Sequence, residues 1–199
     1  MFGLPKTTEI TKQLPKKAIF AKFQLKPAQR DHFDADISRI DIVNFVSPNT
    51  VPGLKEGERV KEFYVLLVSL KHQEYDEKNI LLLSKLIKLQ MVFALAYQER
   101  VRFAVVHEKL FLTDWKPMAS AKLPLMGFDL DKVWENLVVS VGSIEVTEGV
   151  TMDEQIAIDG EKQKKIRLIE SLEKKLKVEK QPRKRYEMYK QLNELKEKK

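Results

Sequence analysis

The spacing of apolar residues predicts a series of β-strands in the middle of the chain. Residues 39–46 alternate apolar and polar side chains, which is the period of a strand with one buried face. Residues 63–68 form a continuous apolar run, which is typical of a strand buried on both faces and therefore central in a sheet. Residues 91–97 and 101–107 predict a hairpin around a short polar turn, and residues 109–115 predict a third strand beside it.

Helices are expected on both sides of these strands. Residues 7–14 predict a short helix that ends before the next proline, and residues 18–23 fit either a short strand or a helical turn. In residues 27–37, in residues 77–88 and in the segment after Asp129, apolar side chains recur at three and four residues. This spacing predicts amphipathic helices.

The order of the predicted elements indicates the fold class. Two strands, a helix, three strands and a helix predict an α+β body with a mixed or antiparallel sheet flanked by helices, rather than a doubly wound parallel sheet. We expect the body to span residues 1–146 and to be followed by a linker over residues 147–160, which contains Gly149 and Gly160.

Residues 161–199 have a different pattern, with a narrow apolar stripe in each half and Pro182 between the halves. Proline is tolerated in the first turn of a helix but not in its interior, so Pro182 predicts the start of a second helix after a turn near residues 178–180. The tail is therefore expected to form an antiparallel helical hairpin, with a kinked helix in an intermolecular coiled coil as the alternative. The stripes consist of Ile166, Ile169, Leu172 and Leu176, and of Met188, Leu192 and Leu195.

Charge separates the tail from the body more sharply than hydropathy does. The chain has 36 basic and 29 acidic residues, of which residues 161–199 hold 15 and 7. Residues 1–160 are thus nearly neutral, and the tail is strongly basic. The basic run of the tail could neutralise phosphates in a salt-dependent manner or contact a protein partner, while a solvated coiled-coil face is the plain structural alternative. The candidate contact residues are Lys174, Lys175, Arg183, Lys184 and Arg185.

One segment of the body is a candidate ligand contact. Asp114, Trp115 and Lys116 follow a predicted strand and precede a proline, so they could present an aromatic ring and two charges to a ligand. The alternative is a turn that ends the strand, with Trp115 half-buried.

Other sequence patterns give little support for catalysis. Residues 53–61 have two glycines but lack the ending of a phosphate-binding loop. The three histidines lie in different predicted elements, and no Gly-x-Ser-x-Gly motif is present. We therefore predict no catalytic residue, metal site or cofactor. Three groups of acidic residues could in principle bind Mg²⁺, but their positions on polar helix faces or in first helical turns favour a structural role. The groups are Asp31, Asp34 and Asp36 beside His32; Glu74, Asp76 and Glu77; and Asp129, Asp131 and Glu135.

Composition also bears on the compartment. The chain has no cysteine, so disulfides and thiolate metal sites are excluded. No window approaches the roughly 18 apolar residues of a membrane span, and the first residues lack a long apolar signal-peptide core. We expect a cytoplasmic protein.

Several stretches together resemble a known family. Residues 4–10 (LPKTTEI), 14–17 (LPKK), 63–71 and 113–116 (TDWK), with the lysine-rich tail, resemble the prokaryotic domain-of-unknown-function family DUF4391 over nearly the whole chain. Members of that family tend to be encoded beside helicases and DNA methyltransferases of restriction and phage-defence type loci. The resemblance therefore implies an accessory role centred on DNA, and it implies no catalytic residue.

The leading hypothesis is a non-catalytic accessory subunit of such a system. Its body would dock on a helicase, nuclease or methyltransferase, and its basic hairpin would touch that partner, DNA or RNA; oligomerisation through the tail stays open. One alternative is a small metal-dependent nuclease that uses Asp114. Another is an antitoxin-like inhibitory binder.

Overall fold

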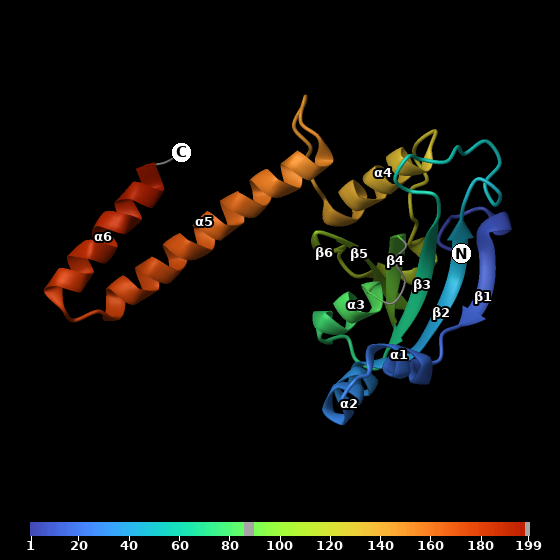
Figure 1. Ribbon diagram of the computed structural model, residues 1–199, viewed down its shortest axis with the longest axis horizontal. Helices are drawn as coiled ribbons and strands as arrows, with labels where there is room; N and C mark the ends of the chain where they lie inside the picture. The colour runs from blue at the N-terminus through green and yellow to red at the C-terminus, as the bar shows by residue number, and fades with distance from the viewer. Residues whose placement is uncertain (86–89, 198–199) are drawn as a thin grey trace. The chain divides into compact units, whose positions relative to one another are not determined.

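The computed structural model describes residues 1–85 and 90–197, and the chain forms two compact units, Met1–Ile144 and Glu145–Lys199 (Figure 1). The first unit is built on a seven-stranded sheet in the order β1-β2-β3-β4-β5-β6, with β7 paired to β5. The strands are β1 (Glu9–Gln13), β2 (Ile37–Val46), β3 (Phe63–Leu70), β4 (Gln90–Tyr97), β5 (Arg100–His107), β6 (Lys109–Leu112) and β7 (Lys116–Pro117).

The sheet is mixed, because β3 and β4 pair in parallel while the other pairs are antiparallel. A parallel pair needs a crossover connection, and α3 (Glu77–Ser84) lies in that connection. The continuous apolar run of β3 does lie at the centre, between β2 and β4. The α+β prediction is therefore confirmed. Residues 86–88, the last part of the helix predicted over residues 77–88, lie outside the described residues.

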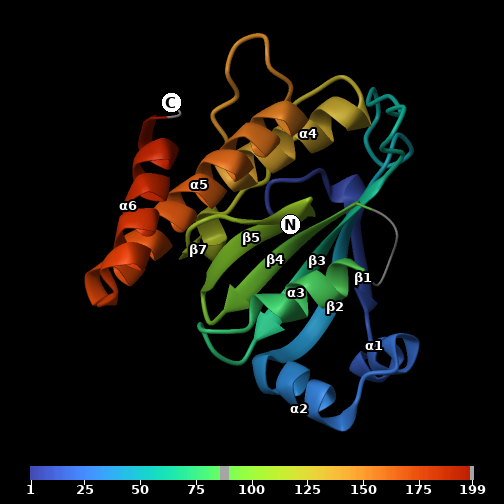
Figure 2. The same cartoon turned by 60° about the vertical axis from the view of Figure 1, so that its left-hand side comes forward.

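One face of the sheet packs against α1 (Lys16–Phe23), α2 (Pro27–Asp36) and α3 (Figure 2). Side chains on alternate positions of a strand point to the same face, and here the strands contribute Leu66, Phe93 and their neighbours to a core that also contains Phe33 of α2. The segment that fitted either a strand or a helical turn is helical, as α1.

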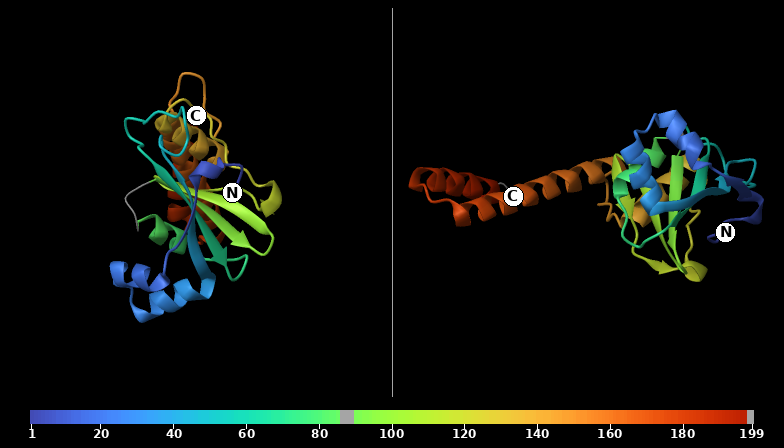
Figure 3. Two further views of the ribbon diagram at one scale, coloured as in Figure 1. Left: turned by 90° about the vertical axis from the view of Figure 1, so that its right-hand side faces the viewer. Right: turned by 90° about the horizontal axis from the view of Figure 1, so that it is seen from below.

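The opposite face carries α4 (Leu130–Gly142) and the N-terminal segment. Trp134 of α4 lies against Phe63, with ring centroids 5.8 Å apart, and Phe2 meets Phe103 edge to face at 5.2 Å. The helices α1, α2 and α3 and the helix α4 thus enclose the central strands from two sides (Figure 3, left).

Two sequence predictions for this unit are wrong. Residues 7–14 are not a helix but a 3-10 turn at Lys6–Thr8 followed by β1, which pairs antiparallel with β2. The β-branched Thr and Ile residues suit a strand, and the exposed edge of β2 supplies the hydrogen-bonding partner. The strand predicted over residues 109–115 ends at Leu112.

The second unit contains α5 (Met152–Val178) and α6 (Pro182–Glu197), which lie in contact (Figure 3, right). The predicted pair of helices and the role of Pro182 as the first residue of α6 are confirmed. The predicted linker over residues 147–160 is only partly a linker, because α5 begins at Met152. A capping box starts it there: Glu154 N donates to Thr151 Oγ1 at 3.3 Å, and Thr151 N donates to Glu154 Oε2 at 2.9 Å.

We expect Phe93→Ala to reduce the free energy of unfolding by about 3–5 kcal/mol, because it empties a fully buried position of β4. Phe128→Ala is the matched control, since the Phe128 side chain is 90% exposed, and its effect should stay below about 0.5 kcal/mol. Urea unfolding at equilibrium measures both. Equal losses in the two variants would contradict the assigned packing of the sheet.

Candidate functional site

The turn between α5 and α6 carries the most concentrated charge of the second unit. Residues 174–185 contain seven basic residues and one acidic residue. We call residues 174–185 the basic tip. It contains all five residues predicted as contacts, and all five are exposed. They are Lys174, Lys175, Arg183, Lys184 and Arg185. Arg183 lies 3.4 Å from Glu187, whereas the other four form no ion pair within residues 1–85 and 90–197.

Three cations of the basic tip lie where they oppose helix formation. A helix has a positive N-terminal end and a negative C-terminal end, so cations favour its last turn and disfavour its first. Lys175 and Lys177 occupy the last turn of α5, which is favourable. Arg183, Lys184 and Arg185 occupy the beginning of α6, whose first turn has no acidic residue. Helix stability therefore does not account for these three cations.

An apolar hollow of about 720 Å³ lies on the hairpin where α5 continues past the end of α6. Ile158 and Leu168 of α5 and Leu195 of α6 form its apolar part. Three lysines and one glutamate surround it: Lys162, Lys164, Lys165 and Glu161. The hairpin itself has one buried leucine in each paired helix, Leu172 and Leu192, so its interior is thin and much of its apolar surface faces outward.

Two of the three residues predicted as a ligand contact in the body lie on opposite faces of the sheet. Trp115 is half-buried on the sheet face of α1 to α3, where the Arg102 guanidinium lies 5.5 Å from its ring centroid. Lys116 Nζ lies 5.6 Å from the ring centroid of Phe103, on the opposite face. Asp114 is exposed. Consecutive residues of an extended chain point to opposite sides, so the segment has no common direction.

Trp115 instead belongs to a small polar hollow that the sequence did not reveal. The hollow measures about 490 Å³ and lies where β3 ends, lined by Tyr75, Arg102 and Trp115 together with Gln73, Glu74 and Glu77. Burial raises the pKa of Tyr75, while the nearby Arg102 guanidinium acts in the opposite direction. Tyr75 and Arg102 are distant in sequence and belong to no motif, so only the pairing of β3, β4 and β5 brings them together.

The acidic groups considered for Mg²⁺ are engaged in local structure. Asp36 Oδ2 accepts hydrogen bonds from Asp76 N and Asn79 Nδ2, both at 2.8 Å. Asp76 caps α3 by accepting from Lys78 N at 2.9 Å, and Asp129 caps α4 by accepting from Lys132 N at 2.8 Å. The structural interpretation of these carboxylates therefore has direct support.

Asp131 holds the loop between β2 and β3. Its carboxylate accepts hydrogen bonds from the backbone N–H groups of Glu58 (2.7 Å), Arg59 (3.1 Å) and Val60 (2.7 Å). A Cβ atom on Gly57 would lie 2.3 Å from Asp131 Oδ1, so the approach needs glycine. Burial raises the pKa of Asp131 and the three backbone hydrogen bonds lower it, with a net pKa below the ordinary value. These N–H groups bind an anion that the chain itself supplies.

The loop that precedes α4 is attached to the same region. Lys55 N donates to Phe128 O at 3.0 Å, and Leu130 N donates to Lys55 O at 3.0 Å. Asn136 Nδ2 donates to Met126 O at 2.7 Å. Phe128 therefore projects into solvent from a backbone that is fixed on both sides.

Within residues 1–85 and 90–197, no three or more His, Asp or Glu side chains gather closely enough to hold a metal ion. In the same residues, no helix has both the length and the apolar composition that crossing a membrane requires.

A family model with the description Domain of unknown function (DUF4391) matches residues 2–198. No curated protein matches the chain, and no solved structure matches it.

We expect Lys184→Glu to raise the helical content and Lys175→Glu to lower it, although both reverse one lysine of the basic tip. Lys184 lies in the first turn of α6 and Lys175 in the last turn of α5, where the helix dipole acts with opposite signs. Circular dichroism at low and high salt measures the change, which screening should reduce. Changes of the same sign in both variants would contradict this explanation.

We expect Asp131→Asn to lower the free energy of unfolding at pH 7 by about 1–2 kcal/mol, because the amide nitrogen cannot accept the loop hydrogen bonds and the site is partly exposed. The folded-state pKa of Asp131 is lowered, so its contribution is complete above the unfolded value of about 3.9 and disappears as pH falls through the folded value.

Urea unfolding at pH 7 and near pH 3 tests this dependence. The difference between wild type and Asp131→Asn should shrink at the lower pH. Asp114→Asn is the control, since Asp114 is exposed, and it should change stability by less than about 0.5 kcal/mol at either pH. A difference that persists unchanged at low pH would contradict the charged hydrogen bonds.

Proposed function

The chain belongs to the DUF4391 family, and from the exposed apolar and basic surfaces of its hairpin we propose that it is a non-catalytic accessory subunit of a restriction or phage-defence type system. It docks through α5 and α6 on a helicase, nuclease or methyltransferase subunit. The basic tip contacts that partner or nucleic acid.

The main support for this proposal is the apolar hollow on the hairpin, whose two helices bury few side chains between them. Most helix stability in proteins comes from packing of an apolar face, yet α5 and α6 bury one leucine each along their paired section. Ile158, Leu168 and Leu195 line a concave surface that a partner side chain or helix can fill. Helix-in-groove recognition uses such surfaces. The surrounding lysines favour a partner segment with acidic residues at its edges.

The basic tip is a second feature that supports this proposal. Its cations at the start of α6 do not serve the helix dipole, and Tyr186 and Tyr189 are exposed on the same helix. Tyrosine and arginine are enriched at interfaces, where each combines a large contact area with polar groups. The tip therefore suits contact with an acidic protein surface or with phosphates.

Fewer observations support the two alternative functions. Asp114 lies in no group of metal-ligating side chains among the residues that the structure describes, so no observation favours a metal-dependent nuclease. An antitoxin-like inhibitory binder would use the same hairpin surfaces. Co-expression separates it from an accessory subunit, because an inhibitor relieves the toxicity of its partner and an accessory subunit does not.

We expect Leu168→Asp to abolish co-purification of the helicase, nuclease or methyltransferase partner from the native host, because it places a carboxylate in the apolar hollow. Ile166→Asp is the matched control. Ile166 is 46% exposed and Leu168 48%, but Ile166 does not line the hollow.

Quantitative mass spectrometry of the purified tagged variants measures the partner. The proposal fails if Leu168→Asp retains the partner at the wild-type level. If both variants lose the partner equally, the hollow is not the docking site, because a substitution outside it then has the same effect.

A further inference from the structure

One segment of the body is strongly basic. Residues 10–30 contain six basic residues and no acidic residue, whereas the rest of Met1–Ile144 contains 15 basic and 17 acidic residues. Such a local excess of one sign on a nearly neutral background produces a strong surface potential. The six residues are Lys12, Lys16, Lys17, Lys22, Lys26 and Arg30.

The fold gathers most of these cations at one end of the sheet. Helices α1 and α2 lie beside each other there, and a hollow of about 780 Å³ opens between them. Lys71, which follows β3, joins the lining because its backbone N donates to Asp36 O at 2.8 Å. The lining of this α1–α2 hollow consists of Lys16, Lys17, Phe20, Ala21, Arg30, Asp31, Asp34 and Lys71.

Some of these cations support the fold, and others are available to a ligand. Lys16 pairs with Asp34 and donates to Ile37 O at 3.0 Å, and Lys71 Nζ donates to Asp34 O. Lys17 and Lys26 are exposed and form no ion pair with any residue that the structure describes. The charge that faces solvent is therefore positive, although two carboxylates belong to the lining.

The aromatic residue of the hollow is already in contact with two other side chains. The Phe20 ring packs edge to face on Phe33 at 5.7 Å, and the Arg30 guanidinium lies 6.0 Å from the Phe20 centroid. Proteins that hold single strands use exposed aromatic rings on which bases stack. Lysines without such rings match a phosphate backbone instead, and duplex DNA carries one charge per roughly 1.7 Å of its length.

We propose that the α1–α2 hollow binds the phosphate backbone of duplex DNA without reading base sequence. Lys17 lines the hollow together with Arg30 and Lys71, and Lys26 extends the positive surface at the start of α2. This site lies on the body, so it is independent of the hairpin surfaces assigned to a protein partner.

The test measures binding of the full-length protein to a fluorescent 20-base-pair duplex at several salt concentrations. We expect Lys17→Gln/Lys26→Gln to weaken binding on the order of 10-fold or more at low salt. Removing two phosphate contacts should also reduce the slope of log K against log salt by about 2. The variant Lys17→Arg/Lys26→Arg keeps the charge and should restore binding.

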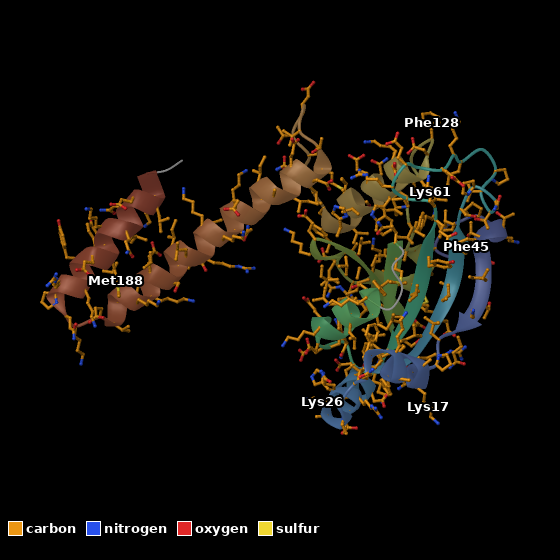
Figure 4. The ribbon with its side chains drawn as sticks, in the orientation of Figure 1. Lys17, Lys26, Phe45, Lys61, Phe128 and Met188 are labelled. Carbon is orange, nitrogen blue, oxygen red and sulfur yellow. The ribbon has the colours of Figure 1, made fainter. Side chains whose placement is uncertain are left out.

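A matched control removes the same charge elsewhere on the body. Lys55 and Lys61 lie in the loop between β2 and β3, roughly 25 Å away along the eight residues of β3. Figure 4 shows Lys61 at the opposite end of the sheet from Lys17 and Lys26. Lys55→Gln/Lys61→Gln should bind DNA as the wild type does.

Three results would overturn the proposal. The first is unchanged binding by Lys17→Gln/Lys26→Gln with a wild-type melting temperature. The second is tighter binding to a single strand or to RNA than to the duplex, and the third is a loss confined to the tip variant Lys174→Gln/Lys175→Gln. Leu168→Asp should retain DNA binding, so failure of the docking proposal leaves this one standing.

Discussion

Strands β3 and β4 run parallel and are buried on both faces. The arrangement of the other elements of the body depends on this pair of strands. Two buried faces need two covering layers. Helices α1, α2 and α3 supply one layer, and α4 with the N-terminal segment supplies the other. A parallel pair also excludes a direct hairpin, so α3 has to lie in the connection. The α1–α2 hollow and the loop held by Asp131 consequently lie at opposite ends of the same strands.

The two units divide the surface chemistry between them. The body concentrates its positive charge on α1 and α2 and is close to neutral elsewhere, whereas the hairpin combines a basic tip with an apolar hollow. Apolar concave surfaces contribute most to affinity for a protein, and exposed lysines contribute most to association with polyanions. An accessory subunit that brings a protein and DNA together needs both kinds of surface.

Elements that are determined by the local sequence pattern could be predicted, and elements that are determined by pairing with a distant strand could not. The apolar run of β3 and the position of Pro182 determine their structures within a few residues, so sequence periodicity identified both. Residues 9–13 become a strand because the edge of β2 is there to pair with, whereas the helix prediction rested on a threonine as the cap and on the following proline. The capping box at Thr151 began α5 earlier than Gly160 suggested, because a cap outweighs one unfavourable glycine.

Site prediction had the same limit. The basic tip is local in sequence and was visible as a charge run, whereas Tyr75 meets Arg102 only through the sheet. The charge of residues 10–30 was concealed because it was averaged over the whole body, and a shorter window reveals it. Trp115 and Lys116 are adjacent in sequence, but an extended chain directs their side chains to opposite faces of the sheet.

The attachment of the loop around Phe128 also has an entropic consequence. Lys55, Leu130 and Asn136 fix its backbone by hydrogen bonds, and Asp131 fixes the neighbouring loop. Loops usually lose conformational freedom when another molecule touches them, and that loss subtracts from affinity. Here the ordering has already taken place during folding. Phe128 is thus an exposed aromatic ring on a pre-organised backbone, for which an encounter carries little further cost of ordering.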